Sequence, residues 1–373
     1  MKAGYYKERA WIEVNLAHLE HNVRQLQKII PESCELMAVV KTDAYGHGAV
    51  LIAKHLNRIG VHAFAVATID EGIQLRKAGI HGMILILGYT GPERIRDIKN
   101  NRLTQTVVDY KHAIELSVRR VRIRVHLKID TGMHRLGIPF DSIRDVQSVI
   151  QMKYLNVTGI YSHLSCADSE DTDDIAFTRL QIVRFQNLID TLNDNGIQLP
   201  KLHLQSSYGL LNYPDLKYDY VRCGIALYGV LSSASDKPKV SPDLRPVLSV
   251  KARVTHLQNV NRGEAIGYGR TFICERDSII ATVSIGYGDG LPRNMYPASA
   301  GIMINEKIAP LAGRISMDQL MVDVTDIKSV KEGNIVTVIN DQNSCVLSVQ
   351  QLAESSGTIT NELLCRLGCR IKH

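Results

Sequence analysis

Short apolar runs alternate with amphipathic stretches through the first two thirds of the chain, and this alternation limits the possible folds more than any other feature. The amphipathic stretches repeat their apolar residues at helical spacing, most clearly at 70–78, 93–100 and 175–192. Eight apolar runs are expected to be β-strands: 36–41, 63–67, 83–87, 104–108, 122–129, 157–162, 201–204 and 220–223. Strands and helices that alternate in this way predict a (β/α)8 barrel.

The alternative for such a pattern is an open, doubly wound sheet. A nucleotide-binding sheet of that kind usually has a Gly-x-Gly-x-x-Gly turn after its first strand, and no such turn follows residues 36–41. The barrel is therefore the expected fold for residues 11–243.

The pattern changes after about residue 240. The stretch 233–239 is rich in serine and is followed by further prolines, which is typical of a linker. Beyond it lie strand-like runs without long helices between them: 247–260, 278–284, 309–311, 320–324 and 334–339. We expect an α/β protein in which a barrel (11–243) precedes a mostly-β C-terminal domain (244–373). An N-terminal strand within residues 1–14 is expected to join the two domains.

The composition argues against several classes of protein. The 373 residues are 45% hydrophobic and 22% charged with a net charge of +6, which is ordinary for a soluble protein of two domains. The basic residues are scattered, which argues against nucleic-acid binding. The seven cysteines are irregularly spaced, so neither a disulfide framework nor a metal site is expected. Without a signal peptide or an apolar run that could span a bilayer, we expect a cytoplasmic chain with no membrane contact from this segment.

Catalytic residues of such barrels lie at the C-terminal ends of the strands. Lys41 ends the first expected strand, where partial burial would lower its pKa and make it a nucleophile or a base. On its own, a lysine that merely ends a strand explains this feature better. Tyr45, Gly46 and Gly48 follow closely, and a glycine turn with a tyrosine hydroxyl suits a phosphate group.

The fifth strand carries a cation at every second position. The two-residue period places Arg122, Arg124, His126 and Lys128 on one face, with Arg135 in the loop that follows. We expect these cations to point into the barrel, where they would need anionic partners. The alternative is that they face solvent at the edge of a strand.

The last three strands end in residues that suit a planar, phosphorylated cofactor. His163 could stack on a ring, although a lone histidine is more often structural. Ser206 and Ser207 follow the seventh strand, and Arg222 and Gly224 the eighth, where barrels commonly bind phosphate. An amine, a phosphate site, a stacking ring and an arginine around one opening are what pyridoxal 5'-phosphate (PLP) requires.

Seven segments of the chain resemble motifs of the alanine racemases, in the same order: 38–48, 128–137, 161–164, 222–229, 267–269, 285–290 and 312–319. The resemblance implies a PLP-dependent amino-acid racemase in which Lys41 holds the cofactor covalently and acts as the base on one face of the α-carbon. Tyr268 would act on the opposite face and would come from the partner subunit. The resemblance therefore implies a homodimer with shared active sites.

The resemblance also implies roles for other residues. Arg222 would contact the pyridine nitrogen, and His163 would stack on the ring. Arg135 would contact the ring hydroxyl and the substrate carboxylate, and Lys128 occupies a position that is often carbamylated. The phosphate would be held by four residues: Tyr45, Ser207, Gly224 and Ile225. The substrate pocket and its entrance would include Tyr287, Met317 and Asp318, the first two from the partner.

Two residues depart from the family pattern. Asn361 replaces a tyrosine, an exchange shared with the serine/alanine racemases of vancomycin-resistance clusters, and Ser206 stands where asparagine is usual. A smaller, hydrogen-bonding residue would admit a hydroxylated substrate. We expect racemisation of serine, alanine or both, which would supply D-amino acid for peptidoglycan precursors. The alternative for Asn361 is a neutral exchange.

Those relatives carry a membrane-embedded domain, and whether this chain is the soluble part of a longer, membrane-anchored protein stays open. Two other functions are alternatives: a PLP-dependent amino-acid decarboxylase of the same fold, and a non-catalytic PLP-binding protein. The second domain, Tyr268 and the pair Met317 and Asp318 favour the racemase.

Overall fold

A closed barrel of eight parallel strands forms the N-terminal part of the computed structural model, which describes residues 8–295, 301–340, 348–367 and 370–371. The strands are β2 (Glu35–Val39), β3 (Ala63–Val66), β4 (Met83–Ile86), β5 (Thr104–Val107), β6 (Ile123–Asp130), β8 (Leu155–Tyr161), β9 (Lys201–Ser206) and β10 (Tyr220–Cys223). The ring closes because β5 pairs with β6 and β10 pairs with β2. The predicted barrel is confirmed.

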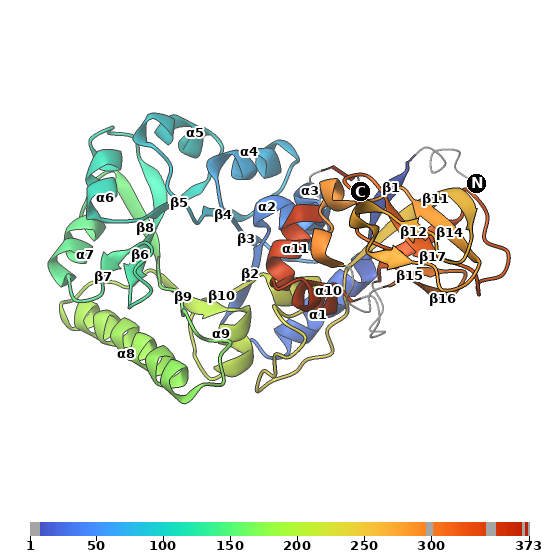
Figure 1. Cartoon of the computed structure of the whole chain (residues 1–373). Helices are drawn as coiled ribbons and strands as arrows, with labels where there is room; N and C mark the ends of the chain where they lie inside the picture. The colour runs from blue at the N-terminus through green and yellow to red at the C-terminus, as the bar shows by residue number, and fades with distance from the viewer. Residues whose placement is uncertain (1–7, 296–300, 341–347, 368–369, 372–373) are drawn as a thin grey trace.

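Helices cover the outside of the barrel (Figure 1); the first of them precedes the first barrel strand and the others follow barrel strands. They are α1 (Leu16–Gln27), α3 (Ala49–Arg58), α4 (Ile69–Lys77), α5 (Ile95–Asn100), α6 (Tyr110–Ser117), α7 (Ile143–Ile150), α8 (Thr172–Asp194) and α9 (Ser207–Asn212). Their apolar stripes face the strands, as in α8, which buries Phe185, Leu188 and Leu192. Short segments lie between them: α2 (Lys41–Gly46), η1 (Pro92–Arg94), β7 (Ile138–Pro139) and η2 (Ile225–Tyr228).

The C-terminal part is built around the long strand β11 (Leu248–Val260). Its neighbours in the sheet are antiparallel to it: β1 (Ala10–Val14), β14 (Ser278–Val283) and β18 (Ile335–Ile339). The same sheet continues through β15 (Gly301–Ile304), β16 (Lys307–Pro310) and β17 (Leu320–Asp323). The expected strand near the N-terminus is therefore present as β1, although residues 1–7 lie outside the described part of the chain.

The remaining elements of this part are short. A hairpin joins β12 (Ala265–Ile266) to β13 (Phe272–Ile273), and single 3-10 turns form η3 (Tyr268–Arg270), η4 (Tyr287–Asp289) and η5 (Arg293–Met295). Two helices close the chain, α10 (Val349–Ser355) and α11 (Thr360–Leu367). Figure 1 shows α11 in red between the barrel and the β domain, where it packs on α2. The boundary at residue 243 stays a prediction.

One expectation about the fifth strand, now β6, was wrong in part. His126 and Lys128 are buried as expected, but Arg122 and Arg124 are exposed. They lie near the N-terminal end of the strand, where the barrel meets solvent, and Arg124 donates to the carbonyl of Arg102 at 2.8 Å. Among the described helices, none has the length and apolar character needed to cross a bilayer.

Candidate functional site

A cavity of about 450 Å³ opens where the barrel strands reach their C-terminal ends. The residues that the sequence singled out in this region line it together: Lys41, Tyr45, Lys128, Arg135, His163, Ser206, Ser207, Arg222, Gly224, Ile225 and Asn361. The closed ring of strands brings them together although they lie far apart in the sequence. The cavity volume is in the range of small-molecule sites.

Lys41 begins a turn with an unusual backbone. The expected strand 36–41 ends at Val39, and residues 42–45 all adopt left-handed dihedrals, with φ between 51° and 55°. None of them is glycine, so the turn costs roughly 4–8 kcal/mol at about 1–2 kcal/mol for each L-residue. Asp43 closes it, because its carbonyl accepts from the N–H of Gly48 at 2.9 Å and its carboxylate accepts from the N–H of Ala49 at 2.7 Å. Such strain persists only where the surroundings hold it, and it concentrates at functional sites.

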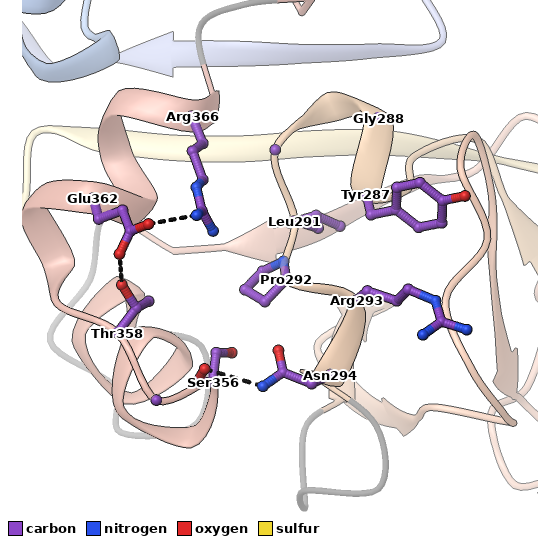
Figure 2. Close-up of a pocket in the computed structure, with 12 residues that line it drawn as sticks. Tyr287, Gly288, Leu291, Pro292, Arg293, Asn294, Ser356, Thr358, Glu362 and Arg366 are labelled. Carbon is purple, nitrogen blue, oxygen red and sulfur yellow. Dashed lines mark hydrogen bonds and ion pairs between the residues drawn. The ribbon is translucent and has the colours of Figure 1, made fainter.

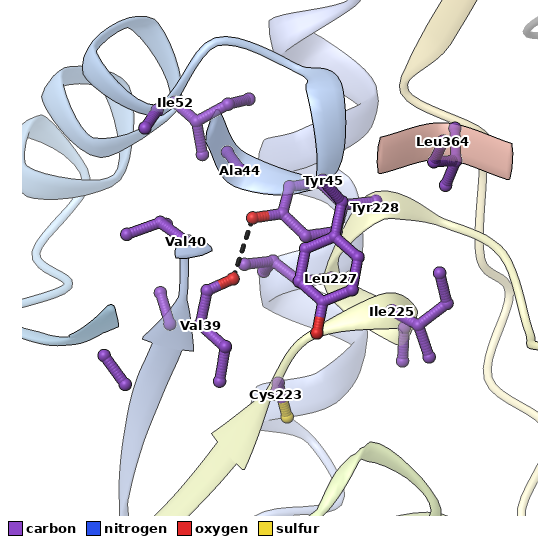
Figure 3. Close-up of a cluster of buried hydrophobic side chains, with 14 of the residues drawn as sticks. Val39, Val40, Ala44, Tyr45, Ile52, Cys223, Ile225, Leu227, Tyr228 and Leu364 are labelled. Carbon is purple, nitrogen blue, oxygen red and sulfur yellow. Dashed lines mark hydrogen bonds between the residues drawn. The ribbon is translucent and has the colours of Figure 1, made fainter. Parts of the chain in front are cut away.

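Tyr45 is the last of the four non-glycine residues with positive φ in this turn, and its ring packs against Tyr228 with centroids 5.1 Å apart. The Tyr228 hydroxyl donates to the Val39 carbonyl at 2.8 Å, which fixes η2 against the end of β2 (Figure 3). Burial raises the pKa of the Tyr45 hydroxyl, so this group stays protonated and can donate a hydrogen bond.

A small polar pocket lies between Tyr45, Ser207 and Gly224. The Ser207 hydroxyl oxygen accepts from the N–H of Gly224 at 3.1 Å and of Ala226 at 3.4 Å, which leaves its own hydrogen available to donate. A Cβ atom on Gly224 would lie 2.7 Å from the Tyr45 hydroxyl oxygen, so only glycine lets this hydroxyl approach the backbone so closely. Two hydroxyl donors beside a position without a side chain suit a phosphate group.

Arg222 is buried and held on several sides. Its guanidinium donates to the carbonyls of Ser162 at 2.8 Å and Leu204 at 2.9 Å, and to Nδ1 of His203 at 2.8 Å. It also contacts Nδ1 of His163 at 3.2 Å. Burial lowers the pKa of Arg222 to about 10, so it remains a cation at neutral pH.

A chain of hydrogen bonds continues from Arg222 through His203 to His126. Because its Nδ1 accepts from Arg222, its Nε2 carries the hydrogen and donates to Nδ1 of His126 at 2.9 Å. Burial and the neighbouring Arg222 lower the pKa of both histidines, that of His126 to about 3, and both rings are neutral. No role was predicted for His203 from the sequence, although a polar residue within a buried strand is a signal that could have marked it.

Lys128 is 5% exposed and lies 5.3 Å from the ring centroid of Tyr161. Burial, followed by the charges of Arg222 and Arg135, lowers the pKa of its amine to about 7. Its Nζ donates to the Ile129 carbonyl at 3.2 Å. A substantial fraction of this amine is therefore neutral near physiological pH.

The residues of the cavity fit PLP. The hydroxyls of Tyr45 and Ser207, beside the backbone at Gly224, match the needs of its phosphate, and Lys41 offers an amine to its aldehyde. Arg222 and His163 supply a fixed cation and a neutral ring in the same cavity.

Asn361 reaches the cavity from the first turn of α11. Its side-chain oxygen accepts from the hydroxyl of Ser232 at 2.8 Å, and the N–H of Ser232 donates to the hydroxyl of Tyr208 at 2.7 Å. Ser232 and Tyr208 also line the cavity, and the sequence did not single them out. With its oxygen engaged, the Asn361 amide has N–H donors left for a ligand.

Four predicted residues lie elsewhere, in the C-terminal domain. Tyr268 and Met317 are 68% and 54% exposed, and Asp318 forms an ion pair with Arg370 at 2.6 Å. Tyr287 lines a separate cavity of about 590 Å³ that shares no lining residue with the first (Figure 2). Within one chain, none of these four lines the cavity that contains Lys41.

Comparison with known families assigns both parts of the chain. Residues 14–232 match the alanine racemase N-terminal domain, and residues 247–373 match the alanine racemase C-terminal domain. The structure is similar to that of an alanine racemase from Clostridium difficile 630, with a TM-score of 0.90, 32% identity and coverage of 98% of this chain and 95% of that one. An alanine racemase from E. faecalis gives a TM-score of 0.89 at 31% identity, covering 100% and 99%.

Curated relatives agree with these matches. An amino-acid racemase of Enterococcus faecalis is 45% identical and a serine/alanine racemase of Enterococcus gallinarum 42% identical, each over 98% of this chain. The chain spans about half of their length (51%). An alanine racemase of Caldanaerobacter subterraneus is 40% identical over 96% of this chain and 93% of its own length. The chain therefore belongs to the alanine racemase family.

Proposed function

We propose that the protein is a PLP-dependent racemase that interconverts the L- and D-forms of serine and alanine. The observation that carries this proposal is the joint presence of Lys41, the phosphate pocket of Tyr45, Ser207 and Gly224, and the buried Arg222 around one cavity. The names of the relatives, amino-acid, serine/alanine and alanine racemase, support the same reaction.

Racemisation needs one group to remove the α-proton and another to return a proton on the opposite face. When bound, PLP withdraws electrons from the α-carbon and so makes its proton acidic. Lys41 moves the proton on one face, and Tyr268 of the partner subunit moves it on the other. Arg222 is a cation held by two carbonyls and by His203, so it would donate a hydrogen bond to the ring nitrogen of bound PLP and would not transfer a proton readily. This limits charge delocalisation and favours return of the proton over side reactions.

The exposed position of Tyr268 supports a dimer with shared sites. Its side chain stands on the surface of the C-terminal domain in the turn Gly267 to Gly269, and both glycines have positive φ angles, 70° and 73°. A second copy of the chain would place this tyrosine at the barrel mouth, with Tyr287, Met317 and Asp318 around it. The two subunits would each complete the other's site.

Asn361 supports activity on serine as well as alanine. Its side-chain oxygen accepts from Ser232, so its amide N–H groups are available to a substrate hydroxyl. Asparagine is also smaller than the tyrosine that the family usually has at this position. We assign the product, D-serine or D-alanine, to peptidoglycan precursors, and D-serine would serve precursors that resist vancomycin. The relatives described above are named as racemases, which favours this reaction over a decarboxylase or a non-catalytic PLP-binding protein.

The test measures racemisation of L-alanine and L-serine by the purified, PLP-loaded chain and by Asn361→Tyr. We expect activity on both substrates in the wild type. We expect the variant to lower the ratio of kcat/KM for serine to that for alanine by about 10-fold, because it removes an amide that bonds the substrate hydroxyl.

Ser232→Ala is the matched control. It frees the Asn361 oxygen without adding a ring, so its ratio should fall between those of the wild type and the variant. A ratio that is unchanged in Asn361→Tyr would contradict the role given to this residue. A wild type that racemises neither substrate would contradict the proposed function.

A further inference from the structure

Glu71 does not line the cavity, yet its carboxylate contacts the peptide that follows Lys41. Glu71 belongs to the first turn of α4, which follows β3, whereas Lys41 follows β2. Its Oε1 accepts a hydrogen bond from the N–H of Thr42 at 2.6 Å. Since β2 and β3 are neighbours in the barrel, this bond joins two adjacent βα units at the mouth.

The second carboxylate oxygen of Glu71 accepts hydrogen bonds at the start of α4. Oε2 accepts from the N–H groups of Ala67 at 2.7 Å and Thr68 at 3.0 Å, and the Thr68 hydroxyl accepts from the N–H of Glu71 at 3.3 Å. These contacts form the capping box at the start of α4. A capping box needs only one carboxylate oxygen, so the bond to Thr42 is additional to it.

The bond acts where the chain turns from an extended to a left-handed conformation. The N–H that it fixes belongs to the peptide between Lys41 and Thr42, and Thr42 is the first of the four left-handed residues. The hydrogen bond within the turn from Ala44 to the Val40 carbonyl begins only two residues later. Glu71 therefore holds the first strained peptide from outside, and this peptide is attached directly to the Cα atom that carries the Lys41 side chain.

We propose that Glu71 is a positioning residue for Lys41. Its carboxylate keeps the Lys41–Thr42 peptide in the orientation that directs the Lys41 amine across the barrel mouth, while the same side chain caps α4. This assignment rests on the proposed function, in which Lys41 is the amine that binds PLP and moves the proton.

Two variants separate the two tasks of Glu71. Glu71→Gln keeps the capping box, because an amide oxygen can still accept from Ala67 and Thr68. Its NH2 group then faces the N–H of Thr42, so that two donors oppose each other and the bond is lost. Thr68→Ala is the matched control, because it weakens the cap of α4 and leaves the contact with Thr42 intact.

The experiment uses the PLP-loaded full chain. Borohydride reduction followed by peptide mass spectrometry measures the fraction of cofactor linked at Lys41, and steady-state assays give kcat and KM for alanine. In Glu71→Gln we expect a lower linked fraction and a kcat at least about 10-fold below wild type with KM within about 2-fold, because the amine is misplaced while substrate contacts remain. Thermal unfolding checks that both variants are folded.

Comparison with the control variant Thr68→Ala separates a positioning role of Glu71 from its role in the cap of α4. Thr68→Ala should lose thermal stability but keep the linked fraction and kcat within about 2-fold of wild type, because a lost cap acts on the helix alone. Equal losses in both variants, or a wild-type linked fraction and kcat in Glu71→Gln, would overturn the positioning role. If the wild type links PLP at Lys41 but racemises nothing, the proposed function fails and the linked fraction still decides the role of Glu71. If the wild type does not link PLP, both proposals fail.

Discussion

At the scale of a single residue, Lys128 shows how burial changes the pKa and the reactivity of an amine. Burial, followed by the charges of Arg222 and Arg135, lowers the pKa of its amine to about 7. The amine also lies 5.3 Å from the ring centroid of Tyr161. An ordinary lysine, with a pKa of about 10.4, is almost wholly protonated at neutral pH and does not attack CO2. A neutral Lys128 can attack CO2 and release a proton, and the carbamate that forms is an anion among cations.

Carbamylation of Lys128 can be tested by its pH dependence. In buffer with 13C-labelled bicarbonate and constant dissolved CO2, we expect a protein carbamate signal by NMR that grows as the pH rises through about 7, because the reactive neutral amine exists above its pKa. Lys128→Arg keeps the cation but cannot form a carbamate, so its spectrum should lack the signal. The hypothesis is wrong if the signal persists in this variant or is absent from the wild type at pH 8.

At the scale of secondary-structure elements, the short segments that follow the barrel strands determine the shape of the site. The turn after β2 and the 3-10 turn η2 after β10 meet where Tyr45 packs on Tyr228. Gly224 stands at this contact, and its lack of a side chain makes room for the Tyr45 hydroxyl. The positions of both segments depend on the pairing of β2 with β10, which closes the barrel.

Gly224→Ala tests this contact. The new Cβ would lie 2.7 Å from the Tyr45 hydroxyl oxygen, so the tyrosine has to move. We expect the free energy of unfolding to fall by about 1–3 kcal/mol from overpacking, and the Kd for PLP to rise.

Calorimetry and equilibrium dialysis measure the two effects, and a double variant supplies the control. Tyr45→Phe removes the clashing oxygen, so Tyr45→Phe with Gly224→Ala should be less destabilised than the sum of the single variants. Additive losses would show that the two residues do not interact.

At the scale of the whole molecule, the candidate site extends over two kinds of domain. The barrel supplies the cavity, α11 brings Asn361 to it, and the C-terminal domain carries Tyr268 on its exposed surface. Asp289 helps to order this domain, because it is fully buried and pairs with Arg9 from the N-terminal segment. Under the proposed function, a complete two-base site would require a second copy of the chain.

Complementation tests the shared site. Lys41→Ala and Tyr268→Phe should each lose most of the racemase activity, by about 100-fold or more, since each removes a proton-transfer group. When the two variants are mixed and allowed to exchange subunits, half of the dimers are mixed and each contains one intact site. About a quarter of wild-type activity should therefore return, as the symmetry of a two-fold dimer requires. Activity that does not return in mixed dimers would place both residues in the same subunit's site.

The sequence alone determined the class of the fold and named eleven of the 23 residues that line the cavity. Alternating apolar and amphipathic segments depend only on local periodicity, so they predicted the barrel strands, with β10 matching residues 220–223. Lys41, His163, Ser207 and Arg222 could be placed in one site because the ends of parallel strands in a closed barrel share one face.

Only the tertiary structure decided what surrounds those residues. Arg124 and Lys128 lie on the same strand at even spacing, yet one is exposed and the other buried, because depth along the barrel axis is not encoded in the period. The left-handed turn after Lys41 and its contact with Glu71 depend on a neighbouring strand, and the bond from Ser232 to Asn361 joins residues 129 positions apart. Such contacts arise from chain closure in space, and no local pattern in the sequence specifies them.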